Sequence, residues 1–277
     1  MNLLSQYTGV GLTVSRGWKM IIPASKTINF TKAGYCRLTL MGAGGSGAIL
    51  NGNGTGATGG NSGPWGVKVF PVTAGGSLVI SLGAGGAAPA ANGSNGLSGS
   101  VSTAVLNSTT ILTAQGGEGG AYRNSVGVAD APVPSAVLIG ADFYVPGIRA
   151  GSVTVISTEY RSSGGAAVDV LQTGRGRSPN VATASAVIGG SIGSDDGTVP
   201  AQYLMLEDFG MLAAGVGAGA SQGNSRAAAA FAGGAGNVDQ AVYTAGGFGG
   251  GGGGSRSTAF AGLGGNAYAY LVFEPTE

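Results

Sequence analysis

Histidine is absent from this chain of 277 residues, and Cys36 is its single cysteine. The common zinc sites need several histidine or cysteine ligands, and a disulfide framework needs paired cysteines, so neither can be built within this chain. A serine nucleophile activated by histidine is excluded for the same reason. We therefore expect no metal ion, no cofactor and no enzymatic activity.

Charged residues are also scarce, at 9% of the chain, and 13 basic residues nearly balance 12 acidic ones. Proteins that bind nucleic acid carry clustered Lys and Arg, which this balance does not favour, so we expect no nucleic-acid partner. No apolar run approaches the roughly 18 residues of a membrane-spanning helix. The best run, 136–145, is interrupted by Gly140 and Asp142, so we expect no insertion into a membrane.

Glycine is the residue that the chain has in excess, with 58 in all and eight of the nine residues in 246–254. A hydrophobic content of 43% and a mean hydropathy of +0.27 differ from the composition of disordered chains, so the glycines need a folded explanation. Collagen needs glycine at every third position and abundant proline. It is excluded, because the glycines here keep no such period and the chain has only 10 prolines. Flexible coil stays open as an alternative for any single run.

The remaining conformation is the extended threefold helix of polyglycine II, which rises about 3.1 Å per residue and has no internal hydrogen bonds. Its N–H and C=O groups point outward, and leaving them unpaired inside a protein is prohibitive. Such helices must therefore lie side by side and bond to one another. Because ordering glycine costs backbone entropy, the bundle needs a hydrophobic base on which to form.

Short apolar or alternating stretches between the glycine segments predict that base to be made of strands. In 35–41, Cys36, Leu38 and Leu40 alternate with Tyr35 and its polar neighbours, as in a half-buried strand. The chain is expected to be all-β, an antiparallel β-sandwich or jelly-roll base with an inserted polyglycine II bundle and almost no α-helix. The predicted strands are 27–31, 35–41, 67–72, 77–82, 110–114, 152–157, 166–171 and 267–273.

Arginine and tyrosine recur together, and both are enriched at binding hot spots. The densest basic site, Arg175-Gly176-Arg177, suits phosphate or carboxylate because guanidinium groups bind both in a bidentate manner; an exposed turn without a ligand is the alternative. Asp195-Asp196 could hold calcium, although a turn with solvated carboxylates is the simpler interpretation. The candidate receptor-binding residues are Tyr122, Arg123, Tyr160, Arg161, Arg175, Arg177 and Tyr203.

Three segments carry a resemblance to a known family. Residues 28–45 read as a strand, the turn Ala33-Gly34, a second strand and a Gly-Ala-Gly-Gly run. Residues 69–86 form a second signature that ends in another Gly-Ala-Gly-Gly run, and 264–273 read as Gly-Gly-Asn-Ala leading into an aromatic strand. This pattern resembles the glycine-rich domains of phage tail-fibre proteins. More loosely, it is similar to the distal adhesins of T-even-like phages, in which polyglycine helices hold receptor-binding loops. The resemblance implies a place on the virion, other virion proteins as partners, and a homotrimer.

We therefore expect a tail-fibre or tail-tip adhesin that recognises a host surface receptor, either an outer-membrane protein or a saccharide. The alternative is a purely structural virion component, such as a fibre connector or capsid decoration. A third interpretation, a glycine-helix protein of a cell surface or one that binds ice, predicts flat Thr/Ala faces.

The predicted organisation has two parts. Residues 1–25 form an N-terminal segment that docks onto a fibre or virion partner, and 26–277 form a single glycine-rich β domain with a less glycine-rich, variable region at 121–210. The receptor-binding loops are expected at 121–135, 158–164, 172–181 and 193–203, with 224–229 and 255–260 as supplementary tips.

Overall fold

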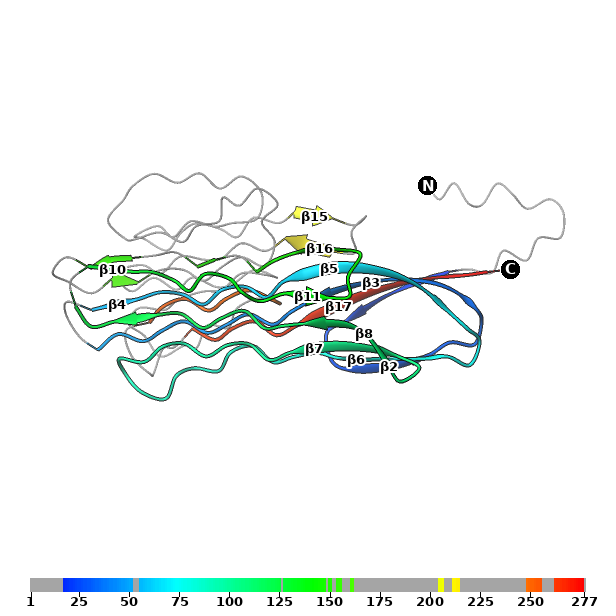
Figure 1. Cartoon of the computed structure of the whole chain (residues 1–277), viewed down its shortest axis with the longest axis horizontal. Helices are drawn as coiled ribbons and strands as arrows, with labels where there is room; N and C mark the ends of the chain where they lie inside the picture. The colour runs from blue at the N-terminus through cyan, green and yellow to red at the C-terminus, as the bar shows by residue number, and fades with distance from the viewer. Residues whose placement is uncertain are drawn as a thin grey trace.

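The computed structural model of the chain describes residues 17–51, 55–125, 127–147, 149–150, 153–155, 160–161, 204–206, 211–214, 248–255 and 262–276. These residues are all-β and include no helix. The expected fold class is confirmed: antiparallel sheets form a sandwich at one end of the molecule, and extended glycine-rich segments run from it to the other end (Figure 1).

The longer strands build the sandwich, and the shorter ones lie along its edges or at the far end of the molecule. They are β1 (Trp18–Ile22), β2 (Lys26–Asn29), β3 (Gly34–Met41), β4 (Gly56–Ala57), β5 (Trp65–Val72), β6 (Ser77–Ser81), β7 (Ser102–Leu106), β8 (Thr109–Ala114), β9 (Tyr122–Arg123), β10 (Gly127–Ala129), β11 (Leu138–Ile139), β12 (Phe143–Val145), β13 (Val153–Val155), β14 (Tyr160–Arg161), β15 (Leu204–Leu206), β16 (Met211–Ala214) and β17 (Tyr268–Pro275).

Two five-stranded sheets make the sandwich. Sheet A has the order β1-β17-β3-β5-β12, and sheet B has the order β11-β8-β7-β6-β2. Every pairing in both sheets is antiparallel. β17 lies between β1 and β3 and is therefore an inner strand of sheet A.

The hydrophobic core lies between the sheets and takes side chains from both, with Leu38 and Leu271 of sheet A and Leu78, Ile80 and Leu112 of sheet B among them. The alternation expected for 35–41 is confirmed on its apolar side, because Cys36, Leu38 and Leu40 all belong to this core. On the other side Tyr35 is exposed but Thr39 is buried, since the outer face of sheet A carries a second apolar cluster.

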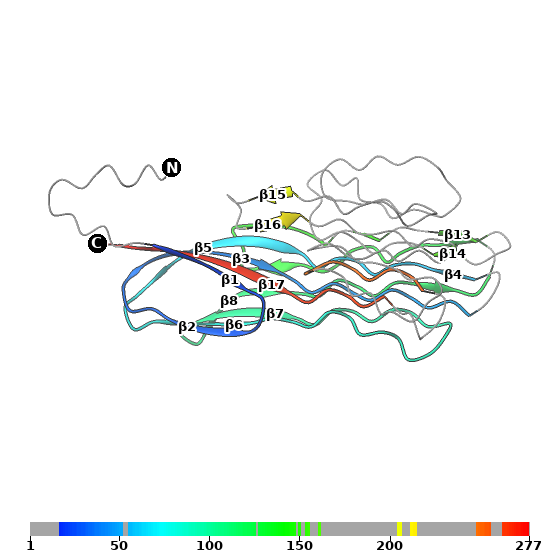
Figure 2. The ribbon, with the colours of Figure 1, turned by 180° about the vertical axis from the view of Figure 1, so that it is seen from behind.

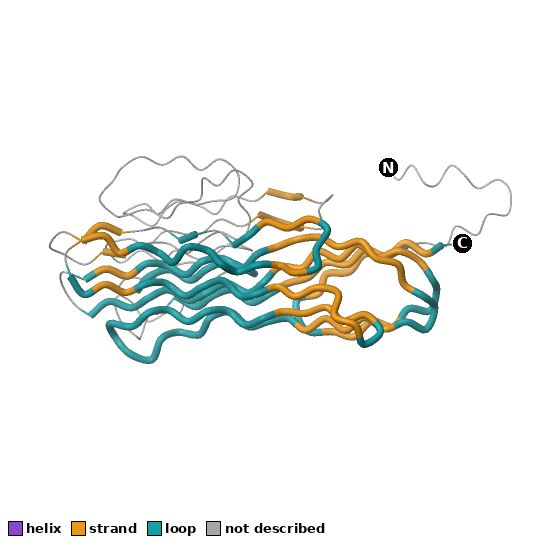
Figure 3. The backbone as a smooth tube through the Cα atoms, in the orientation of Figure 1, coloured by secondary structure: helices purple, strands orange, loops and turns teal. Residues whose placement is uncertain are grey.

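The glycine-rich segments are continuations of the sandwich strands. Figure 3 shows the strands passing directly into extended, roughly parallel segments without regular sheet structure. Segment 42–50 continues β3, 55–64 leads into β5, and 115–121 continues β8. We call the following set the glycine bundle: 42–50, 55–64, 83–89, 94–101, 115–121, 249–255 and 262–267.

Segment 42–50 lies inside the bundle. Most of its backbone N–H groups donate to three neighbours in turn, and the Leu50 N–H donates to Ser255 in segment 249–255 at 2.8 Å. Every third N–H donates to segment 55–64, and the N–H groups between them donate to 94–101 and to 262–267. The pairs are Gly42–Pro64, Gly45–Asn61 and Ala48–Thr58; Ser46–Leu97 and Ile49–Ser94; and Gly44–Gly265 and Gly47–Gly262, all at 2.7–3.0 Å.

The carbonyl groups of the same segment accept from three further neighbours. Segments 83–89, 115–121 and 249–255 provide these donors, through Gly86–Gly44, Gly117–Ala43, Gly120–Ser46, Gly252–Gly45 and Ser255–Ala48, at 2.8–2.9 Å. Segment 42–50 is therefore bonded to six others. The direction of the hydrogen bonds repeats every three residues, and no hydrogen bond lies within the segment. This is the pattern of a polyglycine II helix in a bundle.

Burial follows the same period of three where a segment lies at the surface of the bundle. Along 81–90, Ser81, Ala84, Ala87 and Ala90 are exposed, whereas Gly83, Gly86 and Pro89 are buried. A threefold helix presents every third residue to the same side, so the exposed alanines face solvent and the buried glycines face the other segments.

Glycine is required in the bundle because the backbones come so close. A Cβ built on Gly44 would overlap the carbonyl oxygen of Gly250, and one on Gly47 would overlap that of Gly253. Both obstacles are backbone atoms, which cannot move away independently of their segment. Glycine positions such as 44 and 47 are thus places where segments of the bundle touch.

The strands predicted in 27–31, 35–41, 67–72, 77–82, 110–114, 152–157 and 267–273 are confirmed within a few residues, and 166–171 lies outside the described residues. The sequence interpretation missed β1 and β7, and also the short strands β4, β9, β10, β11, β12, β14, β15 and β16. Because β1 pairs with β17 along Trp18–Ile22, this part of the 1–25 segment belongs to sheet A. The docking role assigned to 1–25 stays a prediction.

Candidate functional site

The end of the bundle far from the sandwich carries a small sheet of its own. Its order is β14-β4-β9, in which β9 is antiparallel and β14 is parallel to β4. Figure 2 shows β4, β13 and β14 at this end, opposite to the end where β17 finishes. We call this end of the molecule the tip.

The tip sheet brings together two of the predicted Tyr-Arg pairs. Tyr160 and Arg123 both lie opposite Gly56, and Arg161 and Tyr122 both lie opposite Ala57. Four of the seven candidate residues therefore flank one short strand, although the two pairs, counted from Arg123 to Tyr160, are 37 positions apart in the sequence. The other three, Arg175, Arg177 and Tyr203, lie outside the described residues.

Tyr122 joins the tip to the bundle. Its partly buried side chain packs against Ala48, Leu50 and Ala57, and its backbone N–H donates to Asn95 Oδ1 at 2.8 Å. One side of Tyr122 therefore has a structural role, and the next residue, Arg123, is exposed.

Asparagines that the sequence interpretation did not single out surround this tyrosine. Gly93 bonds to the Ile49 and Leu50 carbonyls with a φ of +72°. A Cβ on Gly93 would lie 3.1 Å from Asn51 Cβ and 3.3 Å from Tyr122 Cζ, so the turn at 92–95 sits against Asn51 and the tyrosine ring. We define the tip patch as Asn51, Asn92, Asn95, Tyr122, Arg123 and Asn124; Asn-Gly at 51–52 and 92–93 was the available sequence signal.

A polar cluster below the tip fixes the segment that returns from it. Glu118 lies within the bundle segment 115–121, and its Oε1 accepts from the Ser135 N–H and hydroxyl, both at 2.6 Å, and from the Ala136 N–H at 2.9 Å. Its Oε2 accepts from Asn61 Nδ2 at 2.7 Å. The carboxylate thus ties segment 130–137 to two segments of the bundle.

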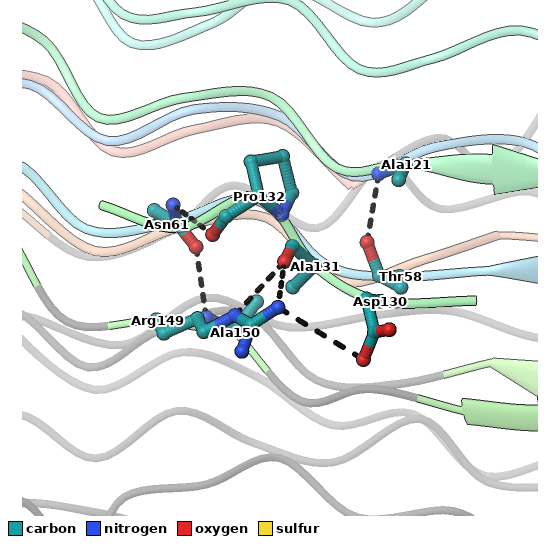
Figure 4. Close-up of polar contacts among 8 residues, drawn as sticks. All are labelled: Thr58, Asn61, Ala121, Asp130, Ala131, Pro132, Arg149 and Ala150. Atoms are coloured by element: carbon teal, nitrogen blue, oxygen red, sulfur yellow. Dashed lines mark hydrogen bonds and ion pairs between the residues drawn. The ribbon is translucent and has the colours of Figure 1, made fainter. Parts of the chain in front are cut away.

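Asn61 is completely buried and uses its whole amide group (Figure 4). Besides Glu118, its Nδ2 donates to the Pro132 carbonyl at 2.9 Å, and its Oδ1 accepts from the Ala150 N–H at 2.9 Å. Nearby, Thr58 Oγ1 accepts from the Ala121 N–H at 2.7 Å. These side-chain bonds add to the direct backbone bonds Thr58–Ala121 and Asn61–Glu118 between the same segments.

Arg149 also has a structural partner in this region. Its Nε donates to the Ala131 carbonyl at 2.9 Å, and its Nη2 lies 3.9 Å from Asp130 Oδ1 (Figure 4). Within the described residues, the Arg149 guanidinium thus holds 149–150 against 130–131. We therefore assign Arg149 a structural role.

The acid dependence of stability tests the role of Glu118. Burial raises the pKa of this carboxyl, but the hydrogen bonds from Ser135 and Asn61 outweigh burial, and the pKa lies below its ordinary value of 4.5. A lowered pKa in the folded state stabilises the protein above pH 4.5, and that contribution is lost as the pH falls through the folded-state pKa. We expect Glu118→Gln to cost about 2 kcal/mol at neutral pH, less than for a fully buried charge because the carboxylate is partly exposed.

The measurement is denaturant unfolding of both proteins from pH 7 to pH 3. The difference between wild type and Glu118→Gln should shrink below pH 4.5, because the wild-type carboxyl is then protonated as well. A difference that stays constant over this range would contradict a role for the ionised carboxylate.

In the part of the chain that the structure describes, no three His, Cys, Asp or Glu side chains gather in a way that could hold a metal ion. The described ranges also contain no helix with the length and apolar character of a membrane span. No protein-family model matches the chain, and a comparison with curated protein sequences finds no significant match.

Proposed function

We propose that the chain is a phage virion protein, an adhesin of the tail fibre or tail tip that recognises the host cell surface through loops at the tip. The observation that carries the proposal is the bonding of segment 42–50 to six neighbours, which makes the bundle a rigid support. The bundle begins at the sandwich and ends in loops at the opposite end (Figure 1). The resemblance of 28–45 and 69–86 to tail-fibre glycine-rich domains points the same way.

Rigid support has a direct consequence for binding. A loop that is already held in place loses little conformational entropy when it meets a receptor, so a few side chains suffice for affinity. Exposed tip residues such as Asn124 lie beyond the close-packed glycines and can vary without disturbing the bundle, whereas Tyr122 is held by its packing against Ala48, Leu50 and Ala57. An adhesin needs this combination, because its binding loops must be able to differ in sequence while the scaffold stays folded.

A purely structural virion component remains the second candidate. The composition of the tip favours the adhesin: Tyr, Arg and Asn gather there, and these are residue types that paratopes use for recognition. Under either function we propose a virion location, other virion proteins as partners, assembly as a homotrimer and no enzymatic activity. The receptor is an outer-membrane protein or a saccharide.

Competition for adsorption separates the two functions. Purified chain is added to host cells before the virus that carries it, and free virus is then counted. An adhesin should block adsorption, and antibodies against the chain should label the distal end of a fibre. Normal adsorption at saturating protein, with label along the shaft or on the capsid, would contradict the proposal and favour the structural component.

Single substitutions in the predicted loops should weaken attachment without affecting folding. We expect Tyr160→Ala or Arg175→Ala to cost about 2 kcal/mol of binding free energy, a roughly 30-fold loss in cell binding, with an unchanged melting temperature. Lys32→Ala is the matched control, because Lys32 is exposed in the turn between β2 and β3, beside Ala33, whose carbonyl accepts from the Thr276 N–H at 3.0 Å. An equal fall in melting temperature would assign Tyr160 or Arg175 to the scaffold instead.

A further inference from the structure

One side of the molecule is built from a part of the chain that carries no charge. Between Lys68 and Glu118 the sequence has no Lys, Arg, Asp or Glu, and this is the longest uncharged stretch of the chain. It holds β6, β7, β8 and the bundle segments 83–89 and 94–101. In Figure 1, β6, β7 and the segments that continue them lie along the lower side, from the sandwich toward the tip. Protein surfaces in water normally mix charges of both signs, so an uncharged side of this length is unusual.

The exposed side chains of this stretch form one continuous surface. Val79 of β6 lies opposite Val105 of β7 on the face of sheet B turned away from the core, since their neighbours along both strands belong to the core. Beyond the strands, the Ser100 N–H donates to the Ala84 carbonyl at 2.8 Å and keeps the two bundle segments side by side. We define the uncharged face as the following fully or partly exposed residues: Val79, Ser81, Ala84, Ala87, Ser98, Val101, Thr103, Val105 and Thr113.

Other surfaces of the molecule do carry charge. The outer face of sheet A presents Lys19, Arg37 and Glu274. Beside it, Lys68 lies 3.8 Å from Asp142, next to the edge strand β12. The lack of charge is therefore a property of one side of the molecule and does not extend over the described surface as a whole.

An uncharged face suits contact with further copies of the same chain. In an assembly with rotational symmetry, the face nearest the axis meets its own copies, so any charge close to the axis approaches the same charge. Like charges that meet across an interface are strongly disfavoured, and an uncharged face avoids that repulsion. A different protein as partner would instead gain specificity and faster association from opposite charges, which this face does not offer.

The face also has the size that such an interface needs. Five residues of strand at about 3.4 Å each and eight residues of threefold helix at about 3.1 Å each give a length of about 40 Å. Three strands about 4.8 Å apart give a width of about 15 Å, and hence a flat area of about 600 Å². A stable interface buries roughly 800 Å² of each partner, and the relief of the side chains adds to the flat area. Val79 and Val101 supply exposed apolar surface within it.

We propose that the uncharged face is the interface between copies of this chain, which pack side by side around an axis parallel to their long axes. Their tips then lie at the same end of the assembly, where several copies can bind one cell surface together. This inference rests on the homotrimer proposed above and locates its interface.

Sedimentation equilibrium of the full chain over a wide range of protein concentration tests the interface. The wild type should form trimers, and Val101→Glu and Ala87→Glu should each weaken association at least roughly 100-fold, because the new carboxylates meet near the axis. Val69→Glu is the matched control: Val69 is 53% exposed and Val101 54%, but Val69 lies on the outer face of sheet A, opposite Arg37. This variant should associate like the wild type.

Cross-linking gives a second measurement that needs no disruptive substitution. Cys36 is buried, so a cysteine introduced at the surface is the accessible thiol. A short bis-maleimide should join copies of Val101→Cys into covalent dimers and leave Val69→Cys uncoupled. Circular dichroism of every variant checks that it is folded.

Three results would overturn the inference: a wild-type chain that stays monomeric, an oligomer that survives both Val101→Glu and Ala87→Glu, or equal cross-linking of the two cysteine variants. Freezing hysteresis by a monomeric chain would assign the face to ice binding instead. A chain that blocks adsorption after any of these results leaves the adhesin function standing. Trimers that Val101→Glu dissociates, but that never block adsorption, would refute the adhesin function and leave the interface in place.

Discussion

Replacing Gly47 with alanine should destabilise the protein by about 3 kcal/mol, and lower its melting temperature by roughly 10 °C. The added Cβ would overlap the carbonyl oxygen of Gly253, while the Gly47 N–H donates to Gly262 at 3.0 Å on another side. Moving segment 42–50 away from one neighbour would break its bonds to the others. The loss of backbone entropy in the unfolded chain offsets less than about 1 kcal/mol of this cost.

Gly75→Ala is the control that separates steric overlap from backbone strain. Gly75 has a φ of +80° in a turn, and no atom lies within 4 Å of a Cβ built there. We expect a cost of about 1 kcal/mol from the left-handed conformation alone. Calorimetry of the two variants decides the matter: if Gly47→Ala melts no lower than Gly75→Ala, the segments are not in contact as described.

The second large effect is expected at Asn61. Asn61→Ala removes hydrogen bonds to Glu118, Pro132 and Ala150 from a fully buried position. Buried groups left without partners cost about 1–3 kcal/mol each, so we expect a loss of about 3 kcal/mol at neutral pH. Urea unfolding measures this loss directly.

Asn61→Asp provides a sharper version of the test. Its carboxylate can still accept from the Ala150 N–H, but it would face the Glu118 carboxylate, which lies 2.7 Å from Nδ2 in the wild type. Two carboxylates this close raise the pKa of one of them, so the folded state binds a proton more readily than the unfolded state. Asn61→Asp should therefore be less stable than Asn61→Ala at pH 7 and should gain stability as the pH falls. A loss that does not vary with pH would contradict the contact with Glu118.

The overall architecture could be predicted because it follows from elementary backbone chemistry. Glycine runs without side chains have to bond to one another, and the period-two pattern of 35–41 places Cys36, Leu38 and Leu40 in the core of a sandwich, as the structure confirms. The strand β1 was missed because Lys19 interrupts its apolar character, and β7 because Ser102, Thr103 and Ala104 are small or polar. β1 forms a strand because it pairs with β17, and β7 forms a strand because it pairs with β6 and β8.

The candidate site was predictable only in part. Composition drew attention to Tyr122, Arg123, Tyr160 and Arg161, but their positions on either side of β4 depend on the register of three separate segments. The tip asparagines could not be distinguished from ordinary turn residues, because Asn-Gly is common in turns whatever their function. The polar cluster of Glu118 and Asn61 joins residues 57 positions apart, and no local pattern encodes such a contact.

The place of β17 has a consequence for biosynthesis. Its antiparallel pairing with β3 joins Tyr268 to Met41 and Pro275 to Gly34, and segments 249–255 and 262–267 occupy two of the six positions around 42–50. During synthesis, β3 is therefore made more than 200 residues before its partner β17. Contacts this distant in sequence slow folding and leave strand edges open to wrong pairing meanwhile. Production of the chain should benefit from slow synthesis at low temperature, or from a chaperone that shields β3 and β5 until β17 has been synthesised.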